Sequence, residues 1–192
     1  MKENNANENF ETAFSSPIPL FVKIKNLIFG ENNPELVFKI TIYINLIIWL
    51  IFLIWHTLSY FAISFRDIIL VEKKINVEIL ILNRGSELGY DPSVFMNRLL
   101  NFHSFSIFLW LLIFVGIAFM WRQKLIFKYF IGIPLILYLI LMFFYLGFPY
   151  YKEDTTFFDK TMFFIFLLNT VFYYIMLKNK NSDKDSNFFT SE

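Results

Sequence analysis

Four long stretches of the chain carry no charged side chain, and this feature limits most strongly how the chain can fold. The stretches are residues 40–65, 99–121, 129–151 and 161–177, which are 26, 23, 23 and 17 residues long. At about 1.5 Å of rise per residue, helices of these lengths extend roughly 26 to 39 Å, whereas the hydrocarbon core of a bilayer is about 30 Å thick. Backbone amides in lipid must be bonded within the segment, and the alternating pattern of a membrane β-barrel is absent. We therefore predict an all-α integral membrane four-helix bundle.

The composition supports lipid rather than water as the surroundings of these stretches. Of the 192 residues, 57% are hydrophobic, 21% are aromatic and only 17% are charged. A soluble core interrupts its apolar runs with polar residues every few positions, whereas here the charges gather between the stretches. The fourth stretch is the shortest, and the apolar stems of its flanking residues Lys160 and Lys178 extend it toward the membrane interface.

The predicted spans divide the chain into a membrane domain and two tails. We assign residues 1–33 to a cytoplasmic tail, residues 34–178 to the transmembrane domain with an external loop at 66–98, and residues 179–192 to a second cytoplasmic tail. Within the first tail, residues 20–29 have an amphipathic pattern. This pattern predicts a short helix that either lies on the inner leaflet or packs on a neighbouring helix. The rest of that tail is polar and does not resemble a cleavable signal.

Two proline motifs predict where helices begin. Asn33 precedes Pro34, and Asp91 precedes Pro92, so each pair places an N-cap residue before a proline at the first helical position. Residues 66–90, between these two motifs, are the hardest to assign. Apolar β-branched residues there surround a cluster of charged residues. This segment could form a small hairpin or an irregular extension of a helix.

The distribution of basic residues predicts the orientation. With the N-terminus inside, the cytoplasmic segments hold ten lysines and arginines and the external segments hold seven. The bias is strongest in the short connection at 122–128, where three of seven residues are basic. We therefore expect both termini in the cytoplasm and the protein in the cell (inner or plasma) membrane, with the lipid bilayer as its first partner.

Several classes of function are excluded by what the sequence lacks. The chain has no cysteine, which excludes disulfides, thiolate metal sites and a cysteine nucleophile. No charged residue falls inside a predicted span, so the proton-relay carboxylates of many transporters are missing. A net charge of +1 argues against a nucleic-acid partner. We find no catalytic motif, expect no enzyme activity, and interpret the acidic group Glu153, Asp154 and Asp159 as a solvated turn rather than a calcium site.

The candidate functional residues are uncharged polar groups inside the spans. They are Asn45, His56, Asn101, His103 and Asn169. Their ordinary role is hydrogen bonding between helices. The two histidines, which helix counting places in the outer half of the membrane, could instead ligate a haem or a metal, or carry a proton. Because the neighbours Trp55 and Tyr60 are bulky, we expect no haem, and we assign no metal site.

Two hypotheses for the function remain. The first is a non-catalytic subunit or assembly partner of a larger membrane complex, which binds other membrane proteins or a second copy of itself. Small residues that allow close helix packing are sparse in the spans, so partner helices would complete a loosely packed bundle. The second is a small oligomeric carrier or channel for a neutral or lipophilic solute, built around Asn45, Asn101 and Asn169. Carriers often contain internal repeats, which we do not find here, so the sequence favours the first hypothesis.

Overall fold

A computed structural model describes residues 18–30 and 33–189, with side chains except at 18–21, 24 and 183–189. The predicted polar tail at 1–17 and the last residues 190–192 lie outside this description. Within the described residues the chain forms eight helices and no strand. They are α2 (Ile18–Phe29), α3 (Leu36–Ser64), α4 (Arg66–Lys73), α5 (Val77–Glu87), α6 (Pro92–Trp121), α7 (Phe127–Tyr145), α8 (Gly147–Glu153) and α9 (Phe157–Phe189).

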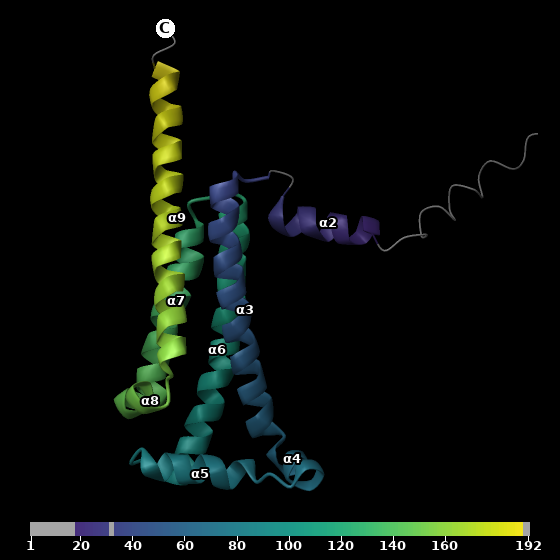
Figure 1. The fold of residues 1–192 in the computed structure, drawn as a ribbon, viewed down its shortest axis with the longest axis vertical. Helices are drawn as coiled ribbons and strands as arrows, with labels where there is room; N and C mark the ends of the chain where they lie inside the picture. Colours follow the sequence, from purple (N-terminus) through teal and green to yellow (C-terminus); the bar gives the residue numbers. More distant parts are fainter. Residues whose placement is uncertain (1–17, 31–32, 190–192) are drawn as a thin grey trace, which may run out of the picture.

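Four of these helices are long and apolar enough to cross a membrane, namely α3, α6, α7 and the Phe157–Ser182 part of α9. They run roughly parallel and form an elongated bundle (Figure 1). The helices α4, α5 and α8 lie toward one end, which we call the α5 end; α2 and the last turns of α9 lie toward the other, which we call the α2 end. The prediction of an all-α, four-span membrane protein is confirmed.

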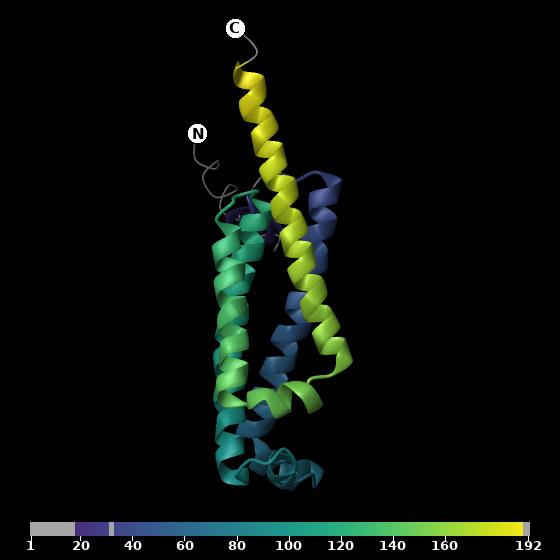
Figure 2. The same cartoon turned by 90° about the vertical axis from the view of Figure 1, so that its left-hand side faces the viewer.

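Helix α6 is the centre of the bundle because it packs against both α3 and α7. Its residues Trp110, Ile113 and Ile117 have no exposed surface. The Trp110 ring stacks on Phe52 of α3 with ring centroids 4.7 Å apart. Side chains from α7 and α9 complete this core in the half of the bundle nearer the α2 end. Helix α9 packs chiefly against α3, and Figure 2 shows it diverging from α7 toward the α5 end.

The closest approach between α6 and α7 occurs at Gly116. A Cβ atom at this position would lie 2.5 Å from Cγ1 of Ile131 and 3.2 Å from the backbone nitrogen of the same residue. Small residues permit such close helix packing in membranes. Gly132 of α7 is different, because a Cβ there would have nothing within 4 Å.

The connection that the sequence left open, residues 66–90, forms two short helices, α4 and α5, so the hairpin alternative is wrong. Asn76 caps α5, because its side chain accepts a hydrogen bond from the Ile79 N–H at 3.0 Å. Helix α5 then packs on the start of α6, where a Cβ at Gly85 would lie 2.9 Å from the Phe95 ring. The α5 end is therefore covered by helix.

Helix α6 begins where the proline motif places it. Pro92 is in the first turn, and the Asp91 side chain accepts hydrogen bonds from the backbone N–H groups of Ser93 and Val94. The Ser93 hydroxyl, followed by these two amides, lowers the pKa of the Asp91 carboxyl. The N-cap is therefore charged at neutral pH, which favours the positive end of the helix dipole.

Two helix boundaries differ from the expected positions. Helix α3 begins at Leu36, and Glu35 rather than Asn33 occupies its N-cap without a side-chain bond. Helix α7 ends at Tyr145, before the end of the predicted span at 129–151. Gly147 has a φ of 68°, which favours glycine, and it turns the chain into α8. Residues 147–153 therefore run across the bundle (Figure 2).

Helix α2 forms over the predicted amphipathic segment and lies nearly perpendicular to α3 (Figure 1). Its C-terminal end is attached to α6, because the Arg122 guanidinium donates a hydrogen bond to the Leu27 carbonyl. The Phe29 ring also makes an edge contact with Trp121 at 5.5 Å between centroids. Among the side chains of α2 that the structure describes, Phe29 packs on α6, whereas Leu27 is 76% exposed.

We predict that Gly116→Ala destabilises the bundle by about 1–3 kcal/mol, because the added methyl group collides with Ile131 and with the α7 backbone. Gly132→Ala is the matched control. It should leave the stability unchanged or raise it by up to about 1 kcal/mol, because alanine favours helix and the space is open. Thermal unfolding of both variants in detergent measures the difference. Equal melting temperatures would show that the helices separate easily at Gly116.

Candidate functional site

A cavity of about 860 Å³ lies between α3, α7, α8 and the start of α9. It is placed toward the α5 end, where α9 has diverged from α7 and α8 bridges the two helices (Figure 2). Small-molecule sites in proteins typically have volumes of about 300–1,000 Å³. The cavity is therefore large enough for an organic ligand.

Most of the cavity wall is apolar. The α3 residue Phe52, the α7 residues Leu139 and Met142, and the α9 residue Phe163 are among its lining side chains. Leu58 also lines the cavity and is 60% exposed on the bundle surface. Because this part of α3 faces lipid in a membrane-spanning bundle, the cavity has an apolar edge through which lipid tails can approach.

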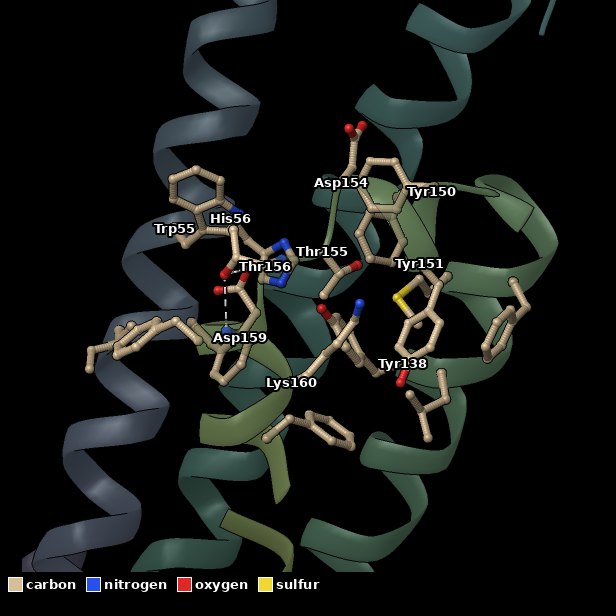
Figure 3. A pocket seen from close by; sticks show the side chains of 18 of the residues that line it. Trp55, His56, Tyr138, Tyr150, Tyr151, Asp154, Thr155, Thr156, Asp159 and Lys160 are labelled. Carbon is tan, nitrogen blue, oxygen red and sulfur yellow. Dashed lines mark hydrogen bonds between the residues drawn. The ribbon is translucent and has the colours of Figure 1, made fainter. Parts of the chain in front are cut away.

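The polar part of the wall comes from the turn between α8 and α9 (Figure 3). Thr156 and Asp159 form a reciprocal cap at the start of α9. The Asp159 carboxylate accepts from the Thr156 N–H at 3.0 Å, and the Thr156 hydroxyl accepts from the Asp159 N–H at 3.1 Å. The Lys160 ammonium lies 4.8 Å from the centre of the Tyr151 ring. We call Thr156, Asp159 and Lys160 the polar rim of the cavity. The hydrogen bonds between Thr156 and Asp159 hold this rim in place.

The rim is also attached to α5 through Arg84. Its guanidinium bonds to Asp154 at 2.6 Å and to Glu87 at 2.6 Å, and it lies 3.8 Å from Glu153. The hydrogen bonds to Glu87 and then Asp154 raise the pKa of Arg84. The acidic group expected to form a solvated turn is thus divided: Glu153 and Asp154 pair with Arg84, and Asp159 caps α9.

Besides Tyr151, two further tyrosines line the cavity. Tyr150 belongs to α8, and burial, followed by the nearby Asp154 and Asp159, raises the pKa of its phenol. Tyr138 belongs to α7, and its ring packs on Phe163 with centroids 5.9 Å apart. With its raised pKa, Tyr150 stays neutral in the physiological pH range and can donate or accept a hydrogen bond.

The two histidines of the chain meet at the wall of the cavity. Nδ1 of His56 on α3 lies 2.9 Å from Nδ1 of His103 on α6, and the two residues are 2% and 3% exposed. The His56 ring also makes edge contacts with Phe102 and Tyr138, at 5.6 and 5.5 Å between centroids. His56 lines the cavity, and its side chain extends from α3 toward the polar rim in Figure 3.

One nitrogen of this pair has no partner. Nε2 of His56 is buried and makes no hydrogen bond to the described residues. Two further buried polar atoms without a partner, Ser106 Oγ and Trp110 Nε1, lie on α6 one and two turns beyond His103. Buried polar atoms are rarely left without a partner in folded proteins, so this part of the α3–α6 interface is unusual.

A second polar cluster joins α3 to α9 outside the cavity. The Asn169 side chain donates to Asn45 Oδ1 at 2.8 Å and to the Thr41 carbonyl at 2.6 Å. The Asn45 side chain in turn donates to Thr170 Oγ1 at 3.1 Å. Asn45 has no exposed surface. This cluster anchors α9, which otherwise buries little of its apolar part.

The structure thus separates the five candidate residues into three groups. His56 and His103 meet beside the cavity. Asn45 and Asn169 bond to each other between α3 and α9. Asn101 is exposed on α6 and joins neither group.

Sequence reasoning missed the tyrosines and the rim. Tyrosines in membrane proteins gather at the interfaces, whereas Tyr138 lies in the middle of its span. The sequence alone therefore already marked Tyr138 as a candidate, because it lies far from either membrane interface. Thr156 and Asp159 carried no comparable signal, because a Thr-x-x-Asp spacing is found at the start of many helices.

The distance within the histidine pair bears on the haem alternative. Metal–imidazole bonds are about 2.0–2.1 Å long, so two histidines on opposite faces of a haem iron hold their nitrogens roughly 4 Å apart. The two Nδ1 atoms are 2.9 Å apart and are joined by a hydrogen bond. In this structure the two rings bond to each other, and the haem alternative stays a prediction.

Comparisons with protein-family models, with curated proteins and with solved structures find no match to this chain. The class of the protein therefore rests on the fold alone. The four apolar helices make it a multi-pass helical membrane protein.

We predict that the bond between Asn45 and Asn169 contributes about 0.6 kcal/mol to the stability and at most about 1.7 kcal/mol, the average and the maximum for hydrogen bonds between membrane helices. A double-mutant cycle with Asn45→Ala, Asn169→Ala and the double variant, followed by unfolding in mixed micelles, measures this coupling. Asn101→Ala is the control, because Asn101 is exposed and belongs to neither cluster. Additive effects of the two single variants would contradict the prediction.

Proposed function

We propose that this protein is a non-catalytic membrane protein that binds an elongated lipophilic molecule in the cavity between α3, α7, α8 and α9. The observation that carries this proposal is the cavity itself, with its apolar edge at Leu58 and its polar rim at Asp159 and Lys160. An amphiphilic molecule has the same division into an apolar chain and a polar end. This favours binding of a lipophilic solute over a simple structural subunit. The site differs from the one in the carrier hypothesis, because Asn45, Asn101 and Asn169 do not line the cavity.

The position of the cavity favours binding from one leaflet over conduction across the membrane. Its lining on α3 reaches Ile51 and Phe52. Beyond them, toward the α2 end, the interior is filled by buried side chains such as Ile113, Phe127 and Tyr173. A packed interior has few voids larger than a water molecule. The cavity is therefore closed on that side, and a bound molecule would exchange with lipid through the α3 edge.

The bias in basic residues supports an orientation in which the α5 end is external and both termini are cytoplasmic. The cavity then draws its ligand from the outer leaflet of the cell membrane. The rim residues lie at the level of the lipid head groups in this arrangement, and Phe52 and Leu139 lie at the level of the tails.

We predict that Leu139→Trp, which fills the cavity, lowers its occupancy about tenfold. The probe is an alkyl chain with a photoreactive diazirine, added to the protein in phospholipid nanodiscs, and mass spectrometry measures the labelled fraction. Ile140→Trp is the matched control, because Ile140 neighbours Leu139 on α7, is 55% exposed and does not line the cavity. Labelling spread evenly over lipid-facing residues, and equal in both variants, would refute the proposal.

The hypothesis of an assembly partner stands as a second candidate, and one feature of α9 favours it. Only 17% of its apolar window is buried, compared with 33–44% in the other three spans. Phe164, Leu168 and Phe172 form part of its exposed face. Lipid tails can cover such a face, so exposure alone does not require a partner.

We predict that a benzophenone side chain in place of Leu168 crosslinks to a second polypeptide in native membranes. The same group in place of Ile136 should not crosslink, although Ile136 on α7 is equally exposed, at 60% compared with 54%. Gel electrophoresis after illumination measures the yield of crosslinked product. If both positions react only with lipid, the protein has no partner on α9 and the cavity is the remaining basis for its function.

A further inference from the structure

We propose that the cavity selects an uncharged lipid whose buried polar group is a single keto or hydroxyl oxygen, and that this oxygen bonds to Nε2 of His56. The inference rests on the proposed function, since it names the chemistry of the molecule that the cavity binds. Three observations carry it: the contact between the two histidines, the unpartnered nitrogen, and the positions of the nearby charges.

The contact between the histidines determines what His56 can offer. Two Nδ1 atoms 2.9 Å apart form a hydrogen bond only if one carries a proton and the other does not. In a neutral imidazole, one nitrogen carries a proton and the other does not. The proton between the rings therefore determines whether Nε2 of His56 is a donor or an acceptor.

Each arrangement of the pair can form a hydrogen bond with a different ligand group. If His103 donates to His56, then Nε2 of His56 carries a proton and bonds to a keto oxygen. If His56 donates to His103, then Nε2 is bare and accepts a bond from a hydroxyl group. To change from one arrangement to the other, a proton crosses the Nδ1–Nδ1 bond, Nε2 of His56 exchanges its proton with water, and Nε2 of His103 changes in the opposite sense. The pair stays neutral overall, so one site can bind either group without charging the protein.

The unpartnered nitrogen indicates where the ligand oxygen lies. Nε2 of His56 has less than 1 Å² of free surface and no partner among the described residues, while the His56 side chain lines the cavity. Leaving a buried polar atom unbonded costs free energy, which a ligand oxygen would recover. Because the nitrogen is covered in this structure, neighbouring side chains must move to admit the oxygen.

The charges near the cavity favour a neutral ligand. Asp154 is bonded to Arg84, and Asp159 is bonded to Thr156, so neither carboxylate is free of partners. The Lys160 ammonium on the rim donates to the Lys152 carbonyl and lies against the Tyr151 ring. These groups lie on or next to the rim, whereas the rings around His56 are those of Phe102, Tyr138 and His103. A charged group among these rings would lose its hydration without gaining an opposite charge. A keto or hydroxyl oxygen needs only one hydrogen bond.

The first test uses ¹⁵N NMR to determine which ring nitrogens of the pair carry a proton. The chain has only two histidines, so protein labelled with ¹⁵N-histidine gives four ring nitrogens to assign. In nanodiscs of phosphatidylcholine, we expect 2-dodecanone to favour protonated Nε2 on His56, because a keto oxygen only accepts, and 2-dodecanol to bond to either form, because a hydroxyl group both donates and accepts. Identical ¹⁵N spectra with the ketone, the alcohol and dodecane would overturn the inference.

The second test compares binding. The same three compounds and dodecanoate compete with the alkyl diazirine probe for the cavity. We expect the ketone and the alcohol to compete about fivefold better than dodecane, the gain of one modest hydrogen bond, and dodecanoate to gain nothing. In the variant His56→Phe with His103→Phe the advantage should disappear. The double change removes both polar partners and keeps aromatic rings, so it leaves no unpaired nitrogen.

The comparison uses the ratio of the competition by the ketone to the competition by dodecane. Because this ratio is measured in both the wild type and the variant, differences in how the compounds enter the bilayer cancel. If all competitors act equally on the wild type while Leu139→Trp still blocks labelling, the selectivity for oxygen is wrong and the cavity remains a binding site. If Leu139→Trp also has no effect, the proposed function itself is wrong. If the double variant does not fold, the ¹⁵N spectra of the wild type decide the question.

Discussion

Backbone amides surrounded by lipid must form their hydrogen bonds within their own helix, and the rest of this structure depends on that constraint. It explains why four uncharged stretches become α3, α6, α7 and part of α9. It also moves the irregular backbone to the ends of the bundle, where α4, α5 and α8 form the connections. Between α6 and α7, the close approach at Gly116 against Ile131 depends on the absence of a side chain on the glycine.

The cavity follows from the way in which α9 is attached. Polar bonds at Asn45 and Asn169, and aromatic packing around Tyr173, hold α9 to the bundle in the half nearer the α2 end. In the other half α9 diverges, and α8 crosses the space between it and α7. Arg84 then joins α5 to the turn after α8, which fixes the rim of the cavity. A helix that is bonded to the bundle in one half and displaced in the other leaves a cavity without any unusual residue in the sequence.

Several parts of the candidate site could be predicted from the sequence, and others could not. His56, His103, Asn45 and Asn169 were recognisable because polar groups are rare in apolar spans and need partners there. Their pairing was not, because helix counting gives the depth of a residue but not the direction in which its helix faces. Asn101 illustrates this limit, since it has the same chemistry and is exposed. The rim at Thr156 and Asp159 depends on where the chain turns back after α8.

The sequence by itself determined that the chain is a four-span helical membrane protein and that α6 begins at Asp91 and Pro92. These features depend on local rules, namely the length of an uncharged segment and the hydrogen bonds of a helix terminus. Only the tertiary structure decided that the two histidines share a hydrogen bond, that Asn45 bonds to Asn169, and that a cavity opens beside α9. These features depend on the rotation and tilt of each helix against its neighbours. Lipid tails cover almost any apolar face equally well, so the pattern of apolar residues alone does not specify which faces meet.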